Sequence, residues 1–481
     1  MTKGDQTFFW YDLETTGTDA RRDRIMQFAG QRTTLALEPI GEPVNVLVRL
    51  TDDILPAPDA IMITGITPQS TLADGLTELE FLNLFTTEVA VPGTIFVGYN
   101  SVRFDDEFMR FLHWRNYHDA YAWQWRDGRS RWDLLDVVRM TRALRPNGIE
   151  WPVVDGKATN RLELITKANN IAHTDAHDAL SDIQACIDVA KLIRTKQQKL
   201  FDYLLSMRDK KLVAKLVETG DPFVYSSGKY DTDFEKTTVA VQFARHPTTQ
   251  GVLVYDLRHD PSEFLALSPE QLVKRWQWTK DKKAPKRLPI KTLQFNRCPA
   301  VAPLSVLDQD SQKRLALDLP MLARHRAVLR EQPDFTKRVL EALQIMDTQR
   351  EKLPNRNTAA EQQLYDGFVG DEDAKLMSVL RAAAPTELND IAADFRDPRL
   401  KALLLPYKVR NFARNLTDEE RAAWEQYRHE KLMDGGAESE LAQFMHRLQQ
   451  LSTAETGRAD KRYLLEELHL YAESILPLMD V

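Results

Sequence analysis

The chain has 481 residues, which is too long for one hydrophobic core and predicts two to four domains. Hydrophobic residues make up 43% and charged residues 28%, as in ordinary globular proteins. The formal net charge of −7, from 64 Lys and Arg against 71 Asp and Glu, excludes binding to polyanions through bulk charge alone. No apolar run approaches the roughly 20 residues of a membrane span, and the N-terminus lacks a signal-peptide core, so we expect a cytoplasmic protein.

The first 195 or so residues alternate strand-like and helical patterns. Short apolar runs predict strands at residues 7–14, 24–33, 42–50 and 94–100. Apolar residues at helical spacing predict helices at 105–117, 131–144, 161–170 and 179–207. Strands first and helices later indicate a mixed sheet flanked by helices, of the α/β class, in a domain spanning 1–195.

The remaining chain divides into a β-rich part and a helical part. β-branched runs at 237–245 and 251–257 indicate a small β domain, and beyond about Asp310 nearly every segment favours helix. We place the domain boundaries at 198–345 and 350–481. The two cysteines, Cys186 and Cys298, match no metal or disulfide spacing and are expected to be buried.

Two carboxylates end the first predicted strand. Asp12 and Glu14 are two residues apart in "TFFWYDLETTG", so their side chains point to the same face of a strand. Two like charges at the end of a buried strand raise each other's cost of ionisation unless a cation lies between them. Either this strand end is solvated or it binds a metal ion.

Further candidate ligands occur in two later segments. In "GYNSVRFDDEF", Asn100 ends a predicted strand and suits a helix N-cap, which places Asp105 in the first helical turns. In "HTDAHDALSD", His177 precedes Asp182 by five residues; on one helix the two would be about 140° apart, so His177 must lie on the preceding loop or first turn to share a site.

Four carboxylates at these positions would suit hard divalent ions. Asp12, Glu14, Asp105 and Asp182 offer the oxygen ligands that two such ions prefer. A pair of ions about 3.5 to 4 Å apart favours in-line phosphodiester hydrolysis, and the imidazole of His177 suits the general base for water.

The order of the motifs is more specific than any one of them. D-x-E-T-x-G at a strand end, N-x3-F-D after a second strand and H-x4-D at a helix start all fall within the 171 residues from Asp12 to Asp182. This set resembles the exonuclease motifs of the histidine-containing branch of the 3′-to-5′ exonuclease superfamily, which has an RNase H-like fold. Further segments, among them "ITGITPQ", "GYNSVRFDDEF", "RLELITKANNIAH", "NRCPAV" and "LYDGF", resemble the bacterial exodeoxyribonuclease I family over almost the whole chain.

The resemblance implies a fold, an activity and site residues. The implied fold is an RNase H-like exonuclease domain, an SH3-like β-barrel and an all-α C-terminal domain. The implied activity is that of a monomeric, single-strand-specific 3′-to-5′ exodeoxyribonuclease that releases 5′-mononucleotides in DNA repair, mismatch repair and recombination. By motif match, two Mg²⁺ ions, which Mn²⁺ can replace, are held by the four carboxylates, with His177 as the general base. The implied substrate contacts are Glu14, Thr15, Arg110, Tyr121, Trp125, Arg139, Arg161, Lys210 and Lys291.

Several nearby residues have a plainer interpretation. We expect Trp114, Trp123 and Trp132 to lie in the core. His173, four residues before His177, is expected to face solvent, and Asp106, Glu107, Asp175 and Asp178 to be helix caps or surface charges. A departure from the family is that Leu13 and Thr16 stand in the first motif where aromatic residues are frequent; the carboxylates are unaffected.

A second basic and aromatic segment lies in the β-rich part. Residues 274–297 contain nine basic residues and one acidic residue, with Trp276, Trp278 and Phe295 among them. Cations for phosphates and aromatic faces for bases suit a single strand. A solvated hairpin whose aromatics pack into the core is an equal alternative.

The resemblance also implies a protein partner. The family docks the acidic C-terminal tail of the single-stranded-DNA-binding protein on a basic surface, for which Arg145, Tyr203 and Arg330 are candidates here, although Asp308 places an acid where a base is expected. Three other functions remain open at this point: an RNA 3′-end trimming exonuclease, a non-catalytic single-strand-binding scaffold and a metal-dependent phosphatase of small substrates.

Overall fold

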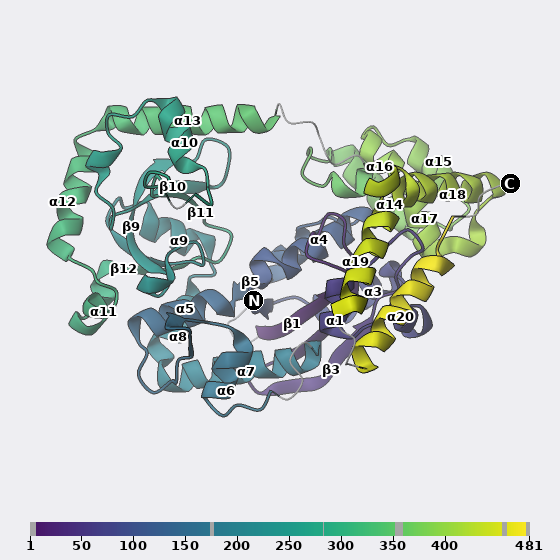
Figure 1. Ribbon diagram of the computed structural model, residues 1–481, viewed down its shortest axis with the longest axis horizontal. Coiled ribbons are helices and arrows are strands. Elements are labelled where there is room, and N and C mark those ends of the chain that lie inside the picture. Colours follow the sequence, from purple (N-terminus) through teal and green to yellow (C-terminus); the bar gives the residue numbers. More distant parts are fainter. Residues whose placement is uncertain (1–5, 174–177, 282, 352–358, 455–458, 478–481) are drawn as a thin grey trace. The chain divides into compact units, whose positions relative to one another are not determined.

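The computed structural model describes residues 6–173, 178–281, 283–351, 359–454 and 459–477 (Figure 1). These residues form two compact units. The first comprises residues up to Ser130, His173–Gln184 and the chain from Asn357 onward, and the second comprises Arg131–Ala172 and Ala185–Arg356. Within the described residues, no helix is long and apolar enough to cross a membrane.

The first unit is built on a mixed sheet whose neighbouring strands run in the order β3-β2-β1-β4. β1 is antiparallel to β2 and parallel to β4, and it is largely buried along its length, as expected of a central strand. Its strands and the helices between and after them are β1 (Thr7–Thr15), β2 (Ile25–Thr33), β3 (Pro39–Leu47), α1 (Pro58–Thr64), α2 (Pro68–Asp74), α3 (Glu78–Leu84), β4 (Thr94–Gly98) and α4 (Asp105–Arg115).

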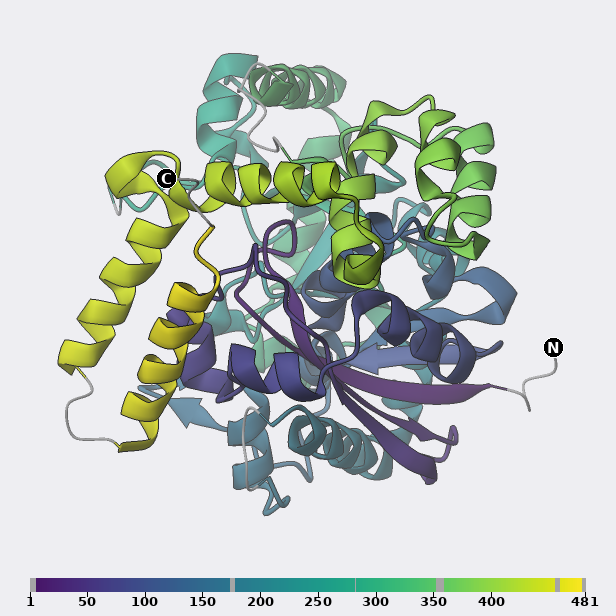
Figure 2. The same ribbon diagram turned by 90° about the vertical axis from the view of Figure 1, so that its right-hand side faces the viewer.

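The C-terminal part of the first unit is helical. Its helices are α14 (Asp371–Ala382), α15 (Leu388–Ala393), α16 (Pro398–Ala402), α17 (Leu404–Phe412), α18 (Asp418–Met433), α19 (Glu440–Ala454) and α20 (Ala459–Ser474). Figure 2 shows α19 and α20, in yellow, beside the purple helix α1. Leu464, Leu465 and Leu468 of α20 pack with Ile61 of α1 and Met26 of β2 in one buried cluster, so the helical part shares a core with the sheet.

The second unit contains a five-stranded antiparallel sheet in the order β11-β10-β9-β8-β12. Val252 and Val254 of β10 and Val301 of β12 pack on Val213 and Val217 of α9 to form its core. Its strands are β5 (Ser130–Asp133, which begins at the last residue of the first unit), β6 (Val153–Val154), β7 (Lys157–Ala158), β8 (Phe223–Ser226), β9 (Thr237–Arg245), β10 (Gly251–Asp256), β11 (Ile290–Gln294) and β12 (Ala300–Pro303).

The second unit also contains helices, which come before, between and after its strands along the chain. They are α5 (Leu134–Leu144), α6 (Leu162–Ala168), α7 (Ala179–Lys196, which begins in the first unit), α8 (Gln198–Ser206), α9 (Lys210–Val217), α10 (Pro269–Trp276), α11 (Gln309–Arg314), α12 (Leu319–Arg330) and α13 (Pro333–Glu351). The helix predicted over 179–207 is two helices, because the chain leaves helical geometry at Gln197. Both cysteines are buried, as expected.

Candidate active site

The end of β1 carries the first two acidic residues. Asp12 pairs with Ala29 and Glu14 with Gln27 on β2, and the register shifts between Glu14 and Thr15. A bulge of this kind increases the local twist and redirects side chains. Thr15 Oγ1 then donates to the carbonyl of Gly17 at 2.7 Å, which holds the turn that comes after the two carboxylates.

Gly17 is needed because the turn after β1 packs closely against Asp23, farther along the same loop. A Cβ built there would lie 2.5 Å from the carboxylate of Asp23. Asp23 accepts a hydrogen bond from Thr16 Oγ1 at 3.1 Å, which joins the two ends of the loop after β1. The T-x-G part of the first motif therefore shapes the strand end.

Asp182 joins the two strand residues from the first turn of α7. Carboxylate oxygens of Asp12, Glu14 and Asp182 all lie within 4.8 Å of one another. We call these three residues the carboxylate cluster. Asp178 precedes α7 and accepts a hydrogen bond from Ser181 N at 2.9 Å, so it is a helix cap, as expected.

Burial and mutual repulsion perturb the carboxylate cluster. Burial, followed by the charge of Asp182, raises the pKa of Asp12 to about 7. Burial raises the pKa of Glu14 to about 9, with further contributions from Asp12, Asp182 and Asp178. A divalent cation would remove this conflict, and a set of carboxylate oxygens is what Mg²⁺ prefers, so these residues fit a hard metal ion.

Asp105 is buried at the first residue of α4, but it is not a member of the carboxylate cluster among the described residues. The strand before it, β4, is the parallel neighbour of β1. Asn100 does not cap a helix with its side chain: it adopts a positive φ of 72°, and the N-cap position of α4 is Phe104. Asn100 is instead the N-cap residue of the short 3₁₀ helix Ser101–Arg103, without a side-chain cap hydrogen bond, so the N-cap prediction holds for that segment and not for α4.

The prediction of a capping or surface position for Asp106 is wrong. It is 1% exposed, and Tyr11 donates its hydroxyl hydrogen to Asp106 Oδ1 at 2.6 Å. Tyr11 immediately precedes Asp12, and Asp106 immediately follows Asp105. This buried hydrogen bond ties the strand of the first motif to the helix of the second.

The prediction that His173 faces solvent is also wrong. Its side chain is 4% exposed, and its Nε2 lies 2.5 Å from Oδ1 of Asp182. His177 and Asp175 lie outside the described residues, so the predicted general base is not placed by the structure. His173 ends the family-like segment "RLELITKANNIAH" and lies four residues before His177, and neither signal shows which way an imidazole turns.

The aromatic block after the second motif divides as expected. Trp114, Trp123 and Trp132 are buried, whereas Tyr121 is 41% and Trp125 60% exposed. Arg110 is buried, with its guanidinium donating to Glu107 at 2.6 Å and to Gln124 at 3.0 Å. Glu107 also accepts a hydrogen bond from the hydroxyl of Tyr365, so it is neither a cap nor an isolated surface charge.

The remaining predicted substrate contacts lie in the second unit. Arg161, at the N-cap of α6, is largely exposed, and Lys210, the first residue of α9, is exposed as well. Arg139 forms an ion pair with Asp136 at 2.5 Å. Lys291 lies over the ring of Tyr230 at 3.5 Å, and burial lowers its pKa to about 8.

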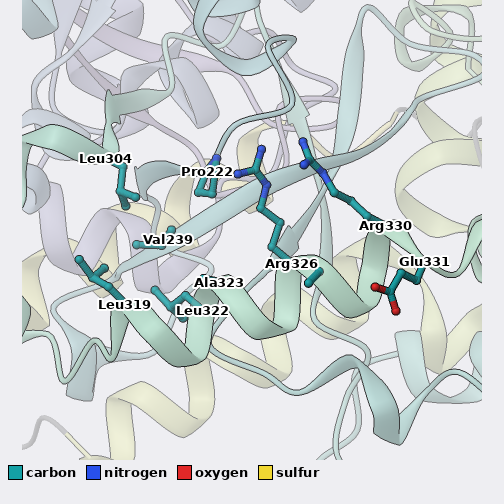
Figure 3. A pocket seen from close by; sticks show the side chains of 10 residues that line it. Pro222, Val239, Leu304, Leu319, Leu322, Ala323, Arg326, Arg330 and Glu331 are labelled. Carbon is teal, nitrogen blue, oxygen red and sulfur yellow. The ribbon is translucent and has the colours of Figure 1, made fainter.

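The residues considered for a protein partner also belong to the second unit. Arg145 forms an ion pair with Asp308 at 3.1 Å, and Asp308 caps α11 by accepting from Ser311 N. Arg330 lines a pocket of about 400 Å³ whose walls include Leu304, Leu319 and Leu322 (Figure 3). In Figure 3 the side chains of Arg326 and Arg330 extend from α12 on the same side.

Comparison with known proteins identifies the family. Models for an exonuclease domain, an exonuclease I SH3-like domain and an exonuclease I C-terminal domain match residues 9–190, 208–344 and 358–475. The exodeoxyribonuclease I of Haemophilus influenzae is 38% identical over 98% of this chain and 99% of its own length. The chain belongs to the exodeoxyribonuclease I family.

Solved structures of the exodeoxyribonuclease I family agree over the full length. Exonuclease I from Methylocaldum szegediense has a TM-score of 0.91 at 42% identity, covering 98% of this chain and 100% of that chain. E. coli exonuclease I in complex with a dA16 oligonucleotide has a TM-score of 0.92 at 36% identity, with the same coverage. The expected family and the three-part fold are confirmed, and the chain is a hydrolase of the exonuclease type.

Proposed function

We propose that this chain is a single-strand-specific 3′-to-5′ exodeoxyribonuclease that releases 5′-mononucleotides. The observation that carries the proposal is the carboxylate cluster at the end of β1, in a chain whose full-length relatives are exodeoxyribonucleases I. An oligonucleotide is bound in the solved E. coli structure that matches 98% of this chain.

The metal site is part of this proposal. Asp12, Glu14 and Asp182 would hold Mg²⁺, with Asp105 as a fourth ligand and Mn²⁺ as a substitute. A zinc-bound form of the E. coli exonuclease I complex with single-stranded DNA, at 36% identity, supports divalent-metal binding by this fold. When bound, two divalent ions supply Lewis-acid stabilisation for the attacking and leaving oxygens of phosphodiester hydrolysis.

The side chains around the metal site have distinct proposed roles. His177 takes the proton from the attacking water. His173 orients the carboxylate of Asp182, in the first turn of α7, as a metal ligand. Tyr121 and Trp125 stack bases with their exposed rings, while Arg161 and Lys210 contact phosphates. Arg110 orients this block through Glu107 and Gln124, and Glu14, Thr15, Arg139 and Lys291 complete the substrate contacts.

Degradation of a 5′-labelled single-stranded oligonucleotide with Mg²⁺ tests the proposal. We expect the wild type to shorten the strand from its 3′ end, releasing 5′-mononucleotides, and to spare a duplex of the same sequence. Asp182→Ala should be inactive. Faster degradation of the matching RNA would assign the chain to RNA 3′-end trimming, and binding without cleavage by the wild type would make it a scaffold.

We also propose that the chain binds the acidic C-terminal tail of the single-stranded-DNA-binding protein. The solved structure of an SSB/exonuclease I complex with an inhibitor, at 35% identity and a TM-score of 0.88, supports this partner. Arg145, Tyr203 and Arg330 are the proposed contacts. The ion pair between Arg145 and Asp308 means that a tail carboxylate must compete with a carboxylate of the chain itself.

A peptide titration tests this partnership. Asp308→Asn keeps an N-cap side chain and removes the competing charge, so we expect tighter binding of the tail peptide, and Arg145→Ala should weaken it. No measurable affinity of the wild type would remove the partner. The proposal further places the enzyme in the cytoplasm as a monomer, with roles in DNA repair, mismatch repair and recombination; sedimentation checks the monomer.

A further inference from the structure

The basic and aromatic segment of the second unit contains an exposed tryptophan. Of the nine tryptophans in the chain, Trp125 and Trp278 are the ones with largely exposed side chains, and Trp278 is 66% exposed. Trp276, two residues earlier, ends α10 and is buried. The segment is therefore a helix, a loop and a strand, with one aromatic side chain in the core and another in solvent.

Hydrogen bonds fix both ends of this loop. Arg287 Nε donates to the carbonyl of Trp276 at 2.9 Å, and Leu288 N donates to the carbonyl of Arg275 at 2.9 Å. Arg275 Nη1 donates in turn to the carbonyl of Lys286 at 2.8 Å. The loop that carries Trp278 is therefore held by hydrogen bonds between its first residues and its last residues.

The charged residues next to Trp278 in the sequence are almost all positive. Lys274, Lys280 and Lys283 are exposed, and within the parts of the chain that the structure describes none of them forms an ion pair. The single acid of the loop, Asp281, accepts a hydrogen bond from Lys283 N at 2.8 Å and so is engaged in the turn. Lys286 is already paired with Glu263 at 2.5 Å. Lys282 lies outside the described residues.

We infer that Trp278, together with Lys274, Lys280 and Lys283, is an additional binding element for single-stranded DNA, located on the SH3-like domain. We call these four residues the Trp278 loop. Its ligand is a stretch of unpaired strand: the indole face stacks on a base, and the three ammonium groups face phosphates. This inference rests on the proposed function, because it assumes that the substrate is single-stranded DNA.

Three features favour a nucleic-acid strand over other occupants. An exposed indole among free cations matches how sequence-independent single-strand binding works, with stacking on an aromatic face and electrostatic contact along the backbone. The only other exposed tryptophan among the described residues, Trp125, lies next to a cation as well, with Arg126 5.8 Å from its ring. The chain as a whole carries −7, so an unopposed basic patch on it is a local feature rather than a consequence of composition.

The first experiment measures binding without turnover. Affinity for oligo(dT) of about 30 nucleotides is measured by fluorescence anisotropy in EDTA for the wild type and for Trp278→Ala, Trp278→Phe and Lys280→Ala/Lys283→Ala. We expect Trp278→Ala to weaken binding about 5- to 100-fold, and Trp278→Phe to retain a large part of the affinity. The double lysine variant should lower the salt dependence by about 0.7 per lost phosphate contact.

A matched control separates the loop from general charge. Lys337→Ala/Lys375→Ala removes two exposed lysines from α13 and α14 and should change neither the affinity nor the salt dependence. Thermal unfolding verifies that each variant is folded. Cleavage by the carboxylate cluster should proceed at an unchanged kcat in Trp278→Ala with saturating DNA, whereas the KM rises.

The outcomes distinguish this inference from the proposed function. If the wild type neither binds nor degrades single strands, the proposed function fails. If the wild type binds and degrades them while the Trp278 and lysine variants match it in affinity and salt dependence, the Trp278 loop is not a DNA-binding element. Loss of binding to anionic vesicles or to an acidic peptide, with DNA affinity unchanged, would equally overturn the inference.

Discussion

Two groups of buried or half-buried carboxylates in the first unit have pKa shifts in opposite directions. In the Glu361 ion cluster, Glu361 accepts hydrogen bonds from Arg24 at 2.7 Å and from Arg410, and all three residues are at most 6% exposed. Burial alone would raise the pKa of Glu361, but Arg410 and Arg24 overcome it and lower that pKa. In the carboxylate cluster, burial and like charges raise the pKa of Asp12 to about 7 and that of Glu14 to about 9.

The difference separates a structural use of buried charge from a functional one. Glu361 joins the loop before β2 to α17 of the helical part, and each buried charge there has a protein partner. The carboxylate cluster gathers three carboxylates, of which Asp182 contacts the imidazole of His173, and among the described residues no Arg or Lys forms an ion pair with them; this costs stability in the absence of a cation. Perturbation of this kind at a strand end is typical of a site that binds an ion.

The largest effect is expected from removing a member of the carboxylate cluster. Asp182→Asn should reduce exonuclease activity at saturating Mg²⁺ by about 1,000-fold or more, because the amide cannot hold the metal ion as a carboxylate does. The measurement is the single-turnover rate on a 5′-labelled strand. Asp188→Asn changes a surface carboxylate of the same helix, which pairs with Lys191 at 3.6 Å, and should leave that rate unchanged. Equal rates for the two variants would contradict the site.

The Glu361 ion cluster should instead respond in stability. Glu361→Ala leaves the guanidinium groups of Arg24 and Arg410 buried without their carboxylate, which we expect to lower the free energy of unfolding by about 3 to 5 kcal/mol. Urea denaturation measures this change. Glu372→Ala removes an exposed partner of Arg396 and should change the free energy of unfolding by about 1 kcal/mol or less. Similar losses in both variants would show that burial does not govern the difference.

One of these two groups of carboxylates, the carboxylate cluster, could be predicted in part from the sequence. Asp12 and Glu14 share a face because strand side chains alternate, and the β1 run was recognisable from its unbroken apolar residues. The Glu361 ion cluster was not accessible, since Arg24 and Glu361 are more than 300 residues apart in the sequence and no local pattern relates them.

Side-chain direction was the other limit. Trp276 and Trp278 are the same residue type in the same basic segment. Trp276 is the last residue of α10 and is buried, whereas Trp278 follows the helix and is exposed. Neither Asp106 nor His173 is a motif-matched ligand or base, so the sequence predicts surface or capping positions for both, whereas both form short hydrogen bonds beside predicted metal ligands. Motifs predict the residues that do chemistry more readily than the residues that orient them.

His173 provides a sharper test of how the carboxylate cluster is organised. His173→Ala removes the group 2.5 Å from Asp182, and we expect Mg²⁺ affinity to fall about 10- to 100-fold because a ligand loses its orienting partner. Isothermal titration with Mg²⁺ measures this directly, without turnover. His177→Ala should show the converse, with little change in Mg²⁺ affinity and a large loss of kcat. Unchanged Mg²⁺ affinity in His173→Ala would mean that the hydrogen bond does not orient Asp182 toward the ion.

The last expected effect is a pH dependence of stability that differs between metal-free and metal-bound protein. The folded-state pKa values of Asp12 and Glu14, about 7 and about 9, are above their ordinary values of 3.8 and 4.5, so the folded protein binds more protons than the unfolded chain in this range. The free energy of unfolding of the metal-free protein therefore falls as pH rises between about 4 and 9.

Thermal unfolding between about pH 5 and pH 8, in EDTA and in excess Mg²⁺, tests this dependence. Mg²⁺ binds the ionised carboxylates and should stabilise the protein more at the higher pH, so that the downward trend seen in EDTA is weakened or reversed. Glu14→Gln should flatten the trend in EDTA, because the amide does not titrate. The Glu361 ion cluster contributes nothing to it, since a lowered carboxylate pKa costs stability only as pH falls below the unfolded value. A metal-free protein that becomes more stable from about pH 5 to pH 8 would show that like-charge repulsion at the end of β1 is compensated within the protein.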